Sequence, residues 1–216
     1  MGDSIVKSDI HSTGASSRGR PREFDIDEVL EAAMELFWKQ GYMQSSLSDL
    51  CAAMDIRPPS FYRAFGTREN LFLKTARFYV DKYWGSIQRE FSEESDVREA
   101  FANLFKNATK MYMRPGLPKG CFIDVSTVGL GSEEARIKDA LAAIDEESRE
   151  VFRKRLLRAI EDGQIPPETD VPAICGAVMA FLKGLSSLAR GNVCQSELAA
   201  IASRGSLLLP PATIEG

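Results

Sequence analysis

The chain has 216 residues, a formal net charge of −4 and 44% hydrophobic residues. Such a chain can fold as a soluble globular protein without disulfides or metal, and it has no apolar run long enough for a membrane span or a signal peptide. Its four cysteines form no CxxC pair, and its one histidine, His11, leaves histidine-based catalysis without a base. We therefore expect a cytoplasmic protein that is not an enzyme, with no cofactor, no metal site and no membrane partner.

Residues 1–17 are rich in Ser, Gly and Asp and show no hydrophobic period, which predicts a disordered leader. Three arginines follow at once, Arg18, Arg20 and Arg22, with no acid among them. A basic arm of this kind reaches into the minor groove of DNA in homeodomains, and the alternative is a solvated basic tail.

The segment from Asp25 to Gln40 predicts an amphipathic helix that Asp25 caps and Gly41 ends.

The local charge of the chain changes sign after residue 55. Residues 23–55 carry eight acids against the single Lys39, whereas residues 57–77 carry five bases against the single Glu69. A local basic surface, rather than the net charge, therefore decides whether the chain can bind DNA.

Residues 46–72 predict a helix-turn-helix followed by the start of a longer helix. Ser46 caps a first short helix, and Asp55 takes the tight left-handed turn after it. Pro58 and Pro59 fit only the first turn of a second short helix, which Gly66 ends as a C-cap. This second helix presents small and basic side chains outward.

This stretch resembles the signature of the TetR/AcrR family of one-component transcriptional repressors over roughly residues 20–80. The chain departs from the family pattern at Asp55, where a glycine is usual, and at Pro58 and Pro59. The resemblance implies an all-α fold, with an N-terminal three-helix helix-turn-helix head joined to a C-terminal helical ligand-binding and dimerisation body. The residues that carry it are Gly41, Ser46, Asp49, Leu50, Ala53, Ile56, Ser60, Tyr62, Phe65, Arg68, Glu69 and Leu71.

We divide the chain accordingly into a leader at 1–17, a helix-turn-helix DNA-binding domain at 18–72 and a ligand-binding and dimerisation domain at 73–210. Tyr62 and Arg68 are placed to hold phosphates, and Arg63 is placed to reach either a guanine or a phosphate. The residues expected at the DNA are Arg18, Arg20, Arg22, Ser45, Ser46, Arg57, Ser60, Tyr62, Arg63 and Arg68.

In the body, a helix of more than twenty residues is predicted from Arg68, and another begins at Asp96. The apolar stripe of the latter should line the interior, so Phe101, Phe105 and Met111 are expected at the ligand site. A long charged helix is predicted from about residue 133 to residue 162. The basic residues near its end either stabilise the negative helix terminus or form a second DNA patch.

Residues 171–188 carry a nearly sevenfold apolar stripe beside small residues that permit close helix approach. A final helix is predicted from Ser196 to about Leu209. In the family, the last two long helices of each subunit form a four-helix dimer interface. The resemblance therefore implies an interface here through Val178, Phe181, Gly184, Leu185 and Leu188.

Cys121 follows the loop RPGLPKG and opens a short apolar stretch. It is either a small buried hydrophobe or a reactive thiol, because Lys119 and a predicted helix start would both favour the thiolate. Some family members look similar around this segment and respond to oxidants, electrophiles or metal ions. Cys121 therefore joins the expected ligand-site residues.

The sequence thus predicts a DNA-binding transcriptional regulator, a repressor that binds a palindromic operator as a homodimer. In this hypothesis, an unknown small-molecule inducer binds in the C-terminal body and releases the repressor from its operator. The alternative is a thiol-based sensor of oxidants, electrophiles or metal ions that acts through Cys121. The competing class is a helical enzyme or a docking protein, and only the regulator should shift short DNA in a salt-sensitive way.

Overall fold

The computed structural model describes residues 25–191 and 193–211, and the described residues form helices and loops without any β-strand. The expected all-α fold is confirmed. In chain order the elements are α1 (Ile26–Gln44), α2 (Leu47–Ala53), α3 (Pro58–Phe65), α4 (Arg68–Tyr79), the π-helical turn η1 (Val80–Trp84), α5 (Gly85–Glu93), α6 (Val97–Tyr112), α7 (Phe122–Ser126), α8 (Ala135–Glu161), α9 (Val171–Arg190), α10 (Gln195–Ala202) and the 3-10 turn η2 (Gly205–Leu208).

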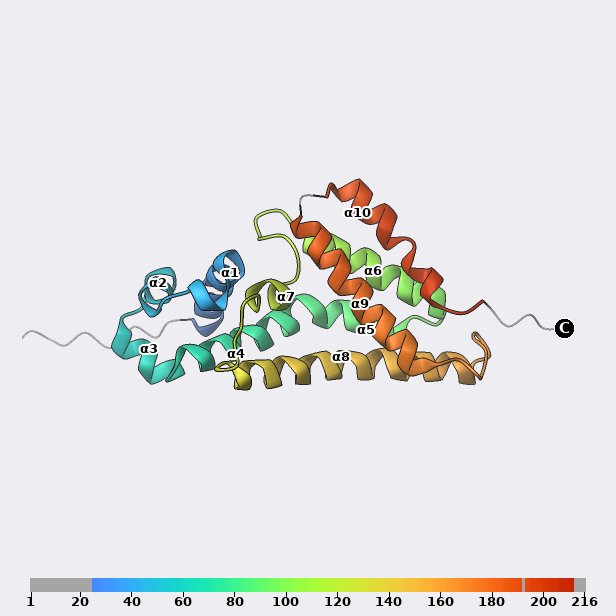
Figure 1. The fold of residues 1–216 in the computed structure, drawn as a ribbon, viewed down its shortest axis with the longest axis horizontal. Coiled ribbons are helices and arrows are strands. Elements are labelled where there is room, and N and C mark those ends of the chain that lie inside the picture. Colours follow the sequence, from blue (N-terminus) through green and yellow to red (C-terminus); the bar gives the residue numbers. More distant parts are fainter. Residues whose placement is uncertain (1–24, 192, 212–216) are drawn as a thin grey trace, which may run out of the picture.

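The molecule is elongated, with a head of α1, α2 and α3 at one end and α6, α9 and α10 gathered toward the other (Figure 1). The elements α4, η1 and α5 follow one another as one rod, and α8 runs beside this rod. The helix expected from Arg68 onward is therefore present, with one π turn inside it. The predicted domain boundary after residue 72 falls inside α4, so the head and the body share this helix.

Local sequence signals shape the head as expected, with one difference. The Asp25 side chain caps α1 by accepting from the backbone N–H of Asp27, and Asp55 (φ 48°) and Gly66 (φ 72°) adopt left-handed conformations. Gly41, also left-handed at φ 81°, interrupts α1, and a last turn continues to Gln44. Only glycine adopts this conformation without strain, which explains the break.

The short helix α7 joins the head to the body. Phe122 is fully buried, and its ring centroid lies 6.0 Å from that of Trp38, 5.7 Å from that of Phe72 and 5.3 Å from that of Tyr79. The Ser126 hydroxyl also donates to the backbone oxygen of Phe37 on α1, at 3.2 Å. The position of α7 is therefore set by both parts of the molecule.

The helix expected from Ser196 to about Leu209 is shorter than predicted, because the chain turns after α10. Gly205 is buried at this turn, and a Cβ atom on it would lie 2.2 Å from the Phe105 ring of α6. Glycine thus allows η2 to pack directly on α6, which ends the straight helix.

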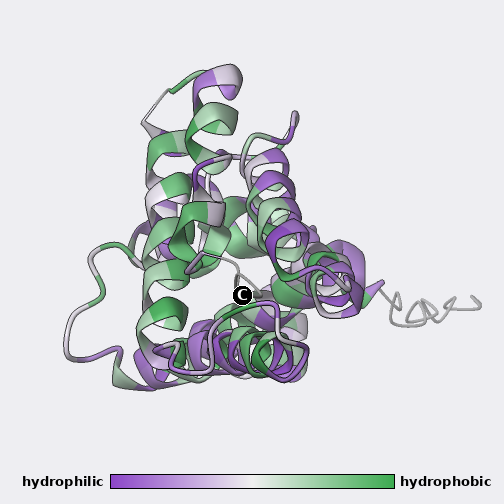
Figure 2. Ribbon diagram, turned by 90° about the vertical axis from the view of Figure 1, so that its right-hand side faces the viewer, coloured by the Kyte–Doolittle hydropathy of each residue, from purple (hydrophilic) through white to green (hydrophobic). Residues whose placement is uncertain are grey.

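Among the described helices, α9 alone is long and apolar enough to cross a membrane by length and composition. Here it packs against α6 and α8, with Val178, Leu182 and Leu185 buried in the body. Figure 2 shows that the helices carry hydrophobic and hydrophilic residues on different sides, as helices around a shared core do.

Candidate nucleic-acid interface and ligand cavity

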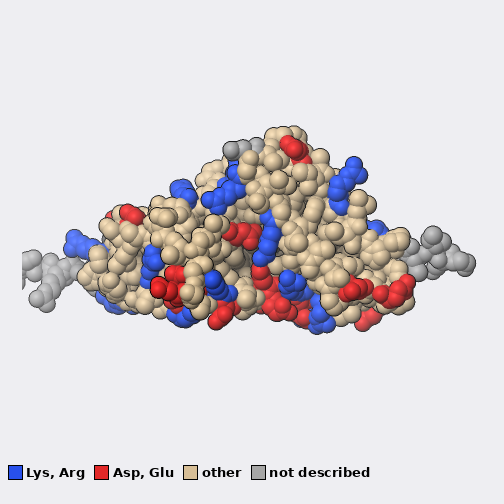
Figure 3. All heavy atoms as spheres, viewed as in Figure 1, with Lys and Arg blue, Asp and Glu red and all other residues tan. Residues whose placement is uncertain are grey.

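The helix α3 presents an open face at the tip of the head. Tyr62 is 56% exposed, Arg57 and Arg63 are exposed, and Ser60 is partly exposed. Within the described part of the chain, neither Arg57 nor Arg63 takes part in an ion pair. Figure 3 shows basic side chains at the end of the molecule that holds α3. These cations are therefore available to phosphates.

The two serines before α2 lie in different environments. Ser46 is exposed and caps α2, because its hydroxyl oxygen accepts from the backbone N–H of Asp49 at 3.1 Å. Ser45 is fully buried, and its hydroxyl donates to the backbone oxygen of Gly41 at 2.7 Å. The Ser45 hydroxyl therefore faces the head's own interior rather than the surface at which the DNA contact was expected.

Arg68 holds the head together from within. Its Nη1 donates to the backbone oxygens of Ser45 at 2.8 Å and Tyr42 at 3.3 Å, and its guanidinium carbon lies 4.2 Å from the centroid of the Tyr42 ring. These contacts join the end of α1 and the start of α2 to α4, so Arg68 has a positioning role within the head. The expected phosphate contact of Arg68 stays a prediction. The arm residues Arg18, Arg20 and Arg22 lie outside the described residues.

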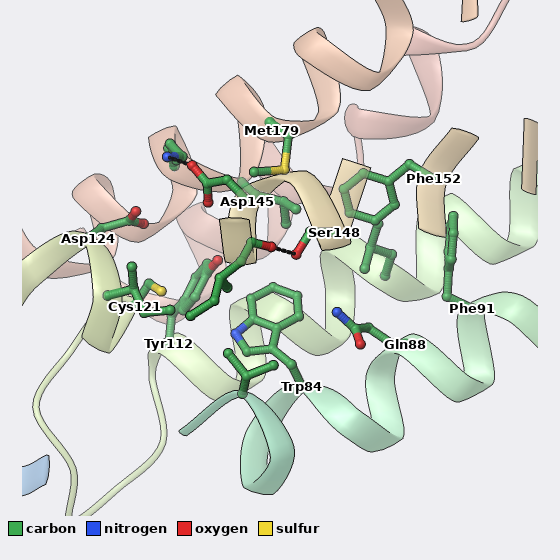
Figure 4. A pocket seen from close by; sticks show the side chains of 16 residues that line it. Trp84, Gln88, Phe91, Tyr112, Cys121, Asp124, Asp145, Ser148, Phe152 and Met179 are labelled. Atoms are coloured by element: carbon green, nitrogen blue, oxygen red, sulfur yellow. Dashed lines mark hydrogen bonds and ion pairs between the residues drawn. The ribbon is translucent and has the colours of Figure 1, made fainter. Parts of the chain in front are cut away.

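A cavity lies in the body between the α4–α5 rod and the helices α6 to α9 (Figure 4). Its volume is about 60 Å³, which is room for several water molecules. Aromatic and aliphatic side chains form most of the wall. The charged groups lie at one end, while Ser148 lies in the middle and Gln88 lies near Phe91 and Phe152 (Figure 4). The lining residues are Val80, Trp84, Gln88, Phe91, Leu104, Tyr112, Cys121, Ile123, Asp124, Ile144, Asp145, Ser148, Phe152, Met179, Leu182 and Lys183.

The polar end of the cavity contains two carboxylates and one ammonium group. The Lys183 ammonium donates to Asp145 at 2.7 Å. Burial raises the pKa of Asp124, and the charge of Lys183 acts against this rise. The neighbouring Trp84 donates from Nε1 to the Tyr79 hydroxyl at 3.3 Å, outside the cavity. Asp145 thus has an ion-pair partner in Lys183, whereas Asp124 takes part in no ion pair with the described residues.

Of the four residues that were expected at the ligand site, the structure places Cys121 alone on the cavity wall. Phe101 packs behind Phe91, with ring centroids 4.9 Å apart, and Phe105 packs against Phe181 at the same centroid distance. Met111 accepts a hydrogen bond from Tyr79. These three side chains lie outside the lining of this cavity, because an inward-facing stripe mostly fills the core and only its gaps border a cavity.

Most of the lining was not found by sequence reasoning. Asp124 had a usable signal, since it is an acid inside the apolar run CFIDV. Trp84, Tyr112, Asp145 and Lys183 had no such signal, because each also fits an ordinary amphipathic helix. Their meeting at one cavity depends on how η1, α6, α8 and α9 pack.

The Cys121 thiol is not activated. Burial, followed by the charge of Asp124, raises its pKa to about 12, so the thiol stays protonated at neutral pH. Lys119 is exposed, and it is not among the main groups that shift this pKa. A thiol trigger needs a thiolate, so the alternative prediction of a sensor acting through Cys121 is not supported here. In the described residues no group of His, Cys, Asp and Glu side chains could hold a metal ion.

The predicted dimer residues divide between two faces of α9. Val178 and Leu185 are buried in the core of the protomer and leave little surface for a partner. Phe181 is partly buried against Phe105. Gly184 and Leu188 are exposed, and they share the outer face of α9 with Ala173, Ala177 and Ala180.

Comparison with known proteins gives consistent results. The family model "Bacterial regulatory proteins, tetR family" matches residues 29–75, and "Tetracyclin repressor-like, C-terminal domain" matches residues 98–200. The chain is 30% identical to the HTH-type transcriptional repressor ComR of Escherichia coli (strain K12) over 195 residues, which cover 90% of this chain and 93% of ComR. It is 28% identical over 157 residues to the HTH-type transcriptional regulator YezE of Bacillus subtilis (strain 168), covering 72% of this chain and 81% of YezE.

Among solved structures, a cysteine mutant of the TetR family transcriptional regulator CifR superposes with a TM-score of 0.84 at 34% identity. The match covers 88% of this chain and 100% of that chain, which is complexed with 26-base-pair double-strand operator DNA. The similarity therefore includes both the head and the helical body.

Proposed function

The chain belongs to the TetR family of regulatory proteins, and from this premise we propose that it is a repressor released from its operator by a small-molecule inducer. The head at residues 18–72 binds DNA, and the body at residues 73–210 holds the inducer and dimerises. A regulator of this kind acts in the cytoplasm by binding rather than by catalysis.

The observation that carries this proposal is the open face of α3. Arg57 and Arg63 are exposed there beside Tyr62, and neither arginine has an ion-pair partner in the described part of the molecule. Cations at the N-terminal turn and outer face of a recognition helix suit phosphate and base contacts in the major groove. The CifR relative, which has the same arrangement of helices, is complexed with operator DNA.

A homodimer follows from the limited reach of one head, because one short recognition helix reads few base pairs. The outer face of α9 supports this part of the proposal. Gly184 has no neighbouring atom within 4 Å of an added Cβ, and Ala180 and Leu188 are exposed on the same side. Small residues on an exposed helix face allow a second copy of the helix to pack closely.

The proposal is tested by selecting duplexes from a random library with the full-length protein and footprinting the selected sites. We expect a two-fold symmetric site whose half-sites are separated by about one turn of DNA, ~34 Å, bound by two protomers. Binding should weaken steeply with salt. An asymmetric site saturated by one protomer would contradict the dimer, and failure to enrich any duplex would contradict DNA binding itself.

A further inference from the structure

The cavity has one carboxylate more than its cations can neutralise. Lys183 is paired with Asp145 at 2.7 Å, whereas Asp124 forms none of the ion pairs found in the described residues. Figure 4 shows Asp124 and Asp145 on the same side of the cavity, above Cys121 and Tyr112. A ligand that enters this end therefore meets a surplus negative charge.

The Tyr112 hydroxyl also lacks a partner. Tyr112 is 1% exposed, and no hydrogen bond to its hydroxyl occurs within residues 25–191 and 193–211. Its ring projects from α6 into the cavity (Figure 4). Because Tyr112 borders the cavity and its hydroxyl has no protein partner in the described residues, the hydroxyl is placed to bind a polar atom of a ligand.

The rest of the cavity favours an apolar ligand body. The rings of Phe91 and Phe152 meet edge to face, with centroids 5.5 Å apart, at the end away from Asp124. The Trp84 ring lies between the two ends, 6.2 Å from the Tyr112 ring. Aromatic faces beside a carboxylate attract an organic cation through both charge and the ring quadrupole.

We propose that the inducer is an amphipathic amine, whose protonated nitrogen lies by the Asp124 carboxylate and the Tyr112 hydroxyl and whose apolar body packs against Phe91 and Phe152. This inference rests on the proposed function. An anionic ligand fits less well, because Lys183, the one cation that the described residues contribute to the lining, is already paired and an anion would lie beside two carboxylates.

The environment of Asp124 supports the amine. Burial raises the pKa of this carboxyl, while the charge of Lys183 and hydrogen bonds from Ser186 and Cys121 act against the rise without cancelling it. Lys183 itself is paired with Asp145. A bound ammonium group supplies a cation for Asp124. The same contact places the ligand against α7, whose Phe122 and Ser126 touch α1 of the head.

Three probes of similar shape test the charge of the ligand: 4-phenylbutylamine, the neutral 4-phenylbutan-1-ol and the anionic 4-phenylbutanoate. Binding to the full-length protein is measured by calorimetry and thermal shift. We expect the amine to bind roughly tenfold or more tightly than the alcohol, because charge-assisted hydrogen bonds exceed neutral ones, and the carboxylate to bind most weakly. Equal affinities, a preference for the carboxylate, or no binding of any probe would each overturn the proposal.

The matched variants are Asp124→Asn, which keeps the shape of the side chain, and Asp139→Asn, which changes an exposed carboxylate on α8 away from the cavity lining. Asp124→Asn should abolish the preference for the amine over the alcohol, and Asp139→Asn should keep it. Tyr112→Phe should weaken both probes while preserving their order. If Asp124→Asn retains the full preference while its unliganded melting curve stays cooperative, Asp124 does not select the ligand.

A DNA-release experiment distinguishes failure of this inference from failure of the proposed function. The ligand-free protein is first titrated with a duplex selected from the random library, and the amine is then added. Tight ligand-free DNA binding with no amine preference overturns only this inference, whereas absence of DNA binding overturns the proposed function. An amine that binds in the cavity without releasing DNA overturns its role as inducer.

Discussion

Arginines a few residues apart in the head do different work because their burial differs. Arg63 lies on the outer face of α3 and is exposed, while Arg68 is partly buried and donates to the backbone oxygens of Tyr42 and Ser45. Sequence pattern alone gives both residues the same basic character. At the scale of single residues, therefore, the contacts of the guanidinium group decide between a DNA contact and a structural one.

Arg68→Ala should destabilise the protein, since it leaves two backbone oxygens of the head without their donor. We expect a loss of about 1.5–3 kcal/mol in the free energy of unfolding, measured by chemical denaturation. Arg63→Ala is the matched change on the exposed face. It should alter stability by less than about 0.5 kcal/mol and reduce the slope of log K against log salt by about 1. Equal stability of the two variants would contradict the structural role of Arg68.

The cysteines should differ in reactivity. The Cys121 thiol, with a pKa raised to about 12 by burial and by Asp124, stays protonated until strongly alkaline pH. Cys194 is exposed, and hydrogen bonds from Ser196 and from the backbone of Glu197 lower the pKa of its thiol. Iodoacetamide at pH 8 should therefore label Cys194 first in the folded protein, with peptide mass spectrometry as the measurement. Cys121 should react at a comparable rate only after unfolding, and early labelling of Cys121 would contradict its burial.

At the scale of elements, close approaches between helices depend on glycines. Gly120 precedes α7 with φ 86°, and a Cβ atom there would lie 2.9 Å from the backbone oxygen of Ser186 on α9. The Ser186 hydroxyl accepts from the backbone N–H of Cys121 at 2.8 Å. The start of α7 is thus fixed against α9, at the same end of the cavity as Asp124.

Gly205 and Gly85 allow a matched test of packing in η2 and α5. A methyl group at Gly205 would meet the Phe105 ring, so Gly205→Ala should lower the free energy of unfolding by about 1–3 kcal/mol. Gly85 has helical backbone angles and no atom within 4 Å of an added Cβ. Gly85→Ala should therefore raise stability by about 0.5–1 kcal/mol. Thermal melts of both variants check the prediction, and stabilisation by Gly205→Ala would show that η2 is not packed as described.

At the scale of the whole molecule, the net charge of −4 and the basic tip of the head are compatible, because the acids gather elsewhere. Two ion pairs connect α4 and α8: Arg77 pairs with Glu147 at 2.6 Å, and Arg136 pairs with Glu69 at 2.7 Å. These exposed pairs join the head-bearing rod to the body, while Arg57 and Arg63 stay free of ion pairs with the described residues.

The outer face of α9 gives a prediction for the assembly. Gly184→Leu introduces no clash inside the protomer, since nothing lies within 4 Å of an added Cβ, so any effect reports on a partner. We expect dimer dissociation to become roughly 10- to 100-fold easier, measured by analytical ultracentrifugation, because the larger side chain separates the packed helices. Lys106→Leu, on the exposed side of α6, is the control and should leave the dimer intact. An unchanged dimer in Gly184→Leu would place the interface elsewhere.

The sequence by itself determined the order and type of most elements and the family of the fold. Caps and turns act locally, so Asp25, Ser46, Asp55 and Gly66 predict helix ends and a turn that the structure confirms. The hydrophobic period likewise predicts α8 and α9, because a buried stripe repeats along one helix whatever lies opposite it.

Tertiary structure alone decided which inward residues border a cavity and which fill the core. Phe101 and Phe105 follow the predicted stripe, yet they pack on other rings, while Trp84, Asp145 and Lys183 meet at the cavity from three helices. Tertiary structure also decided the state of Cys121. The nearby Lys119 predicted a reactive thiol, but burial raises the pKa of this thiol. Periodicity indicates the direction in which a side chain points, but solvation and pairing depend on what other helices bring to the same place.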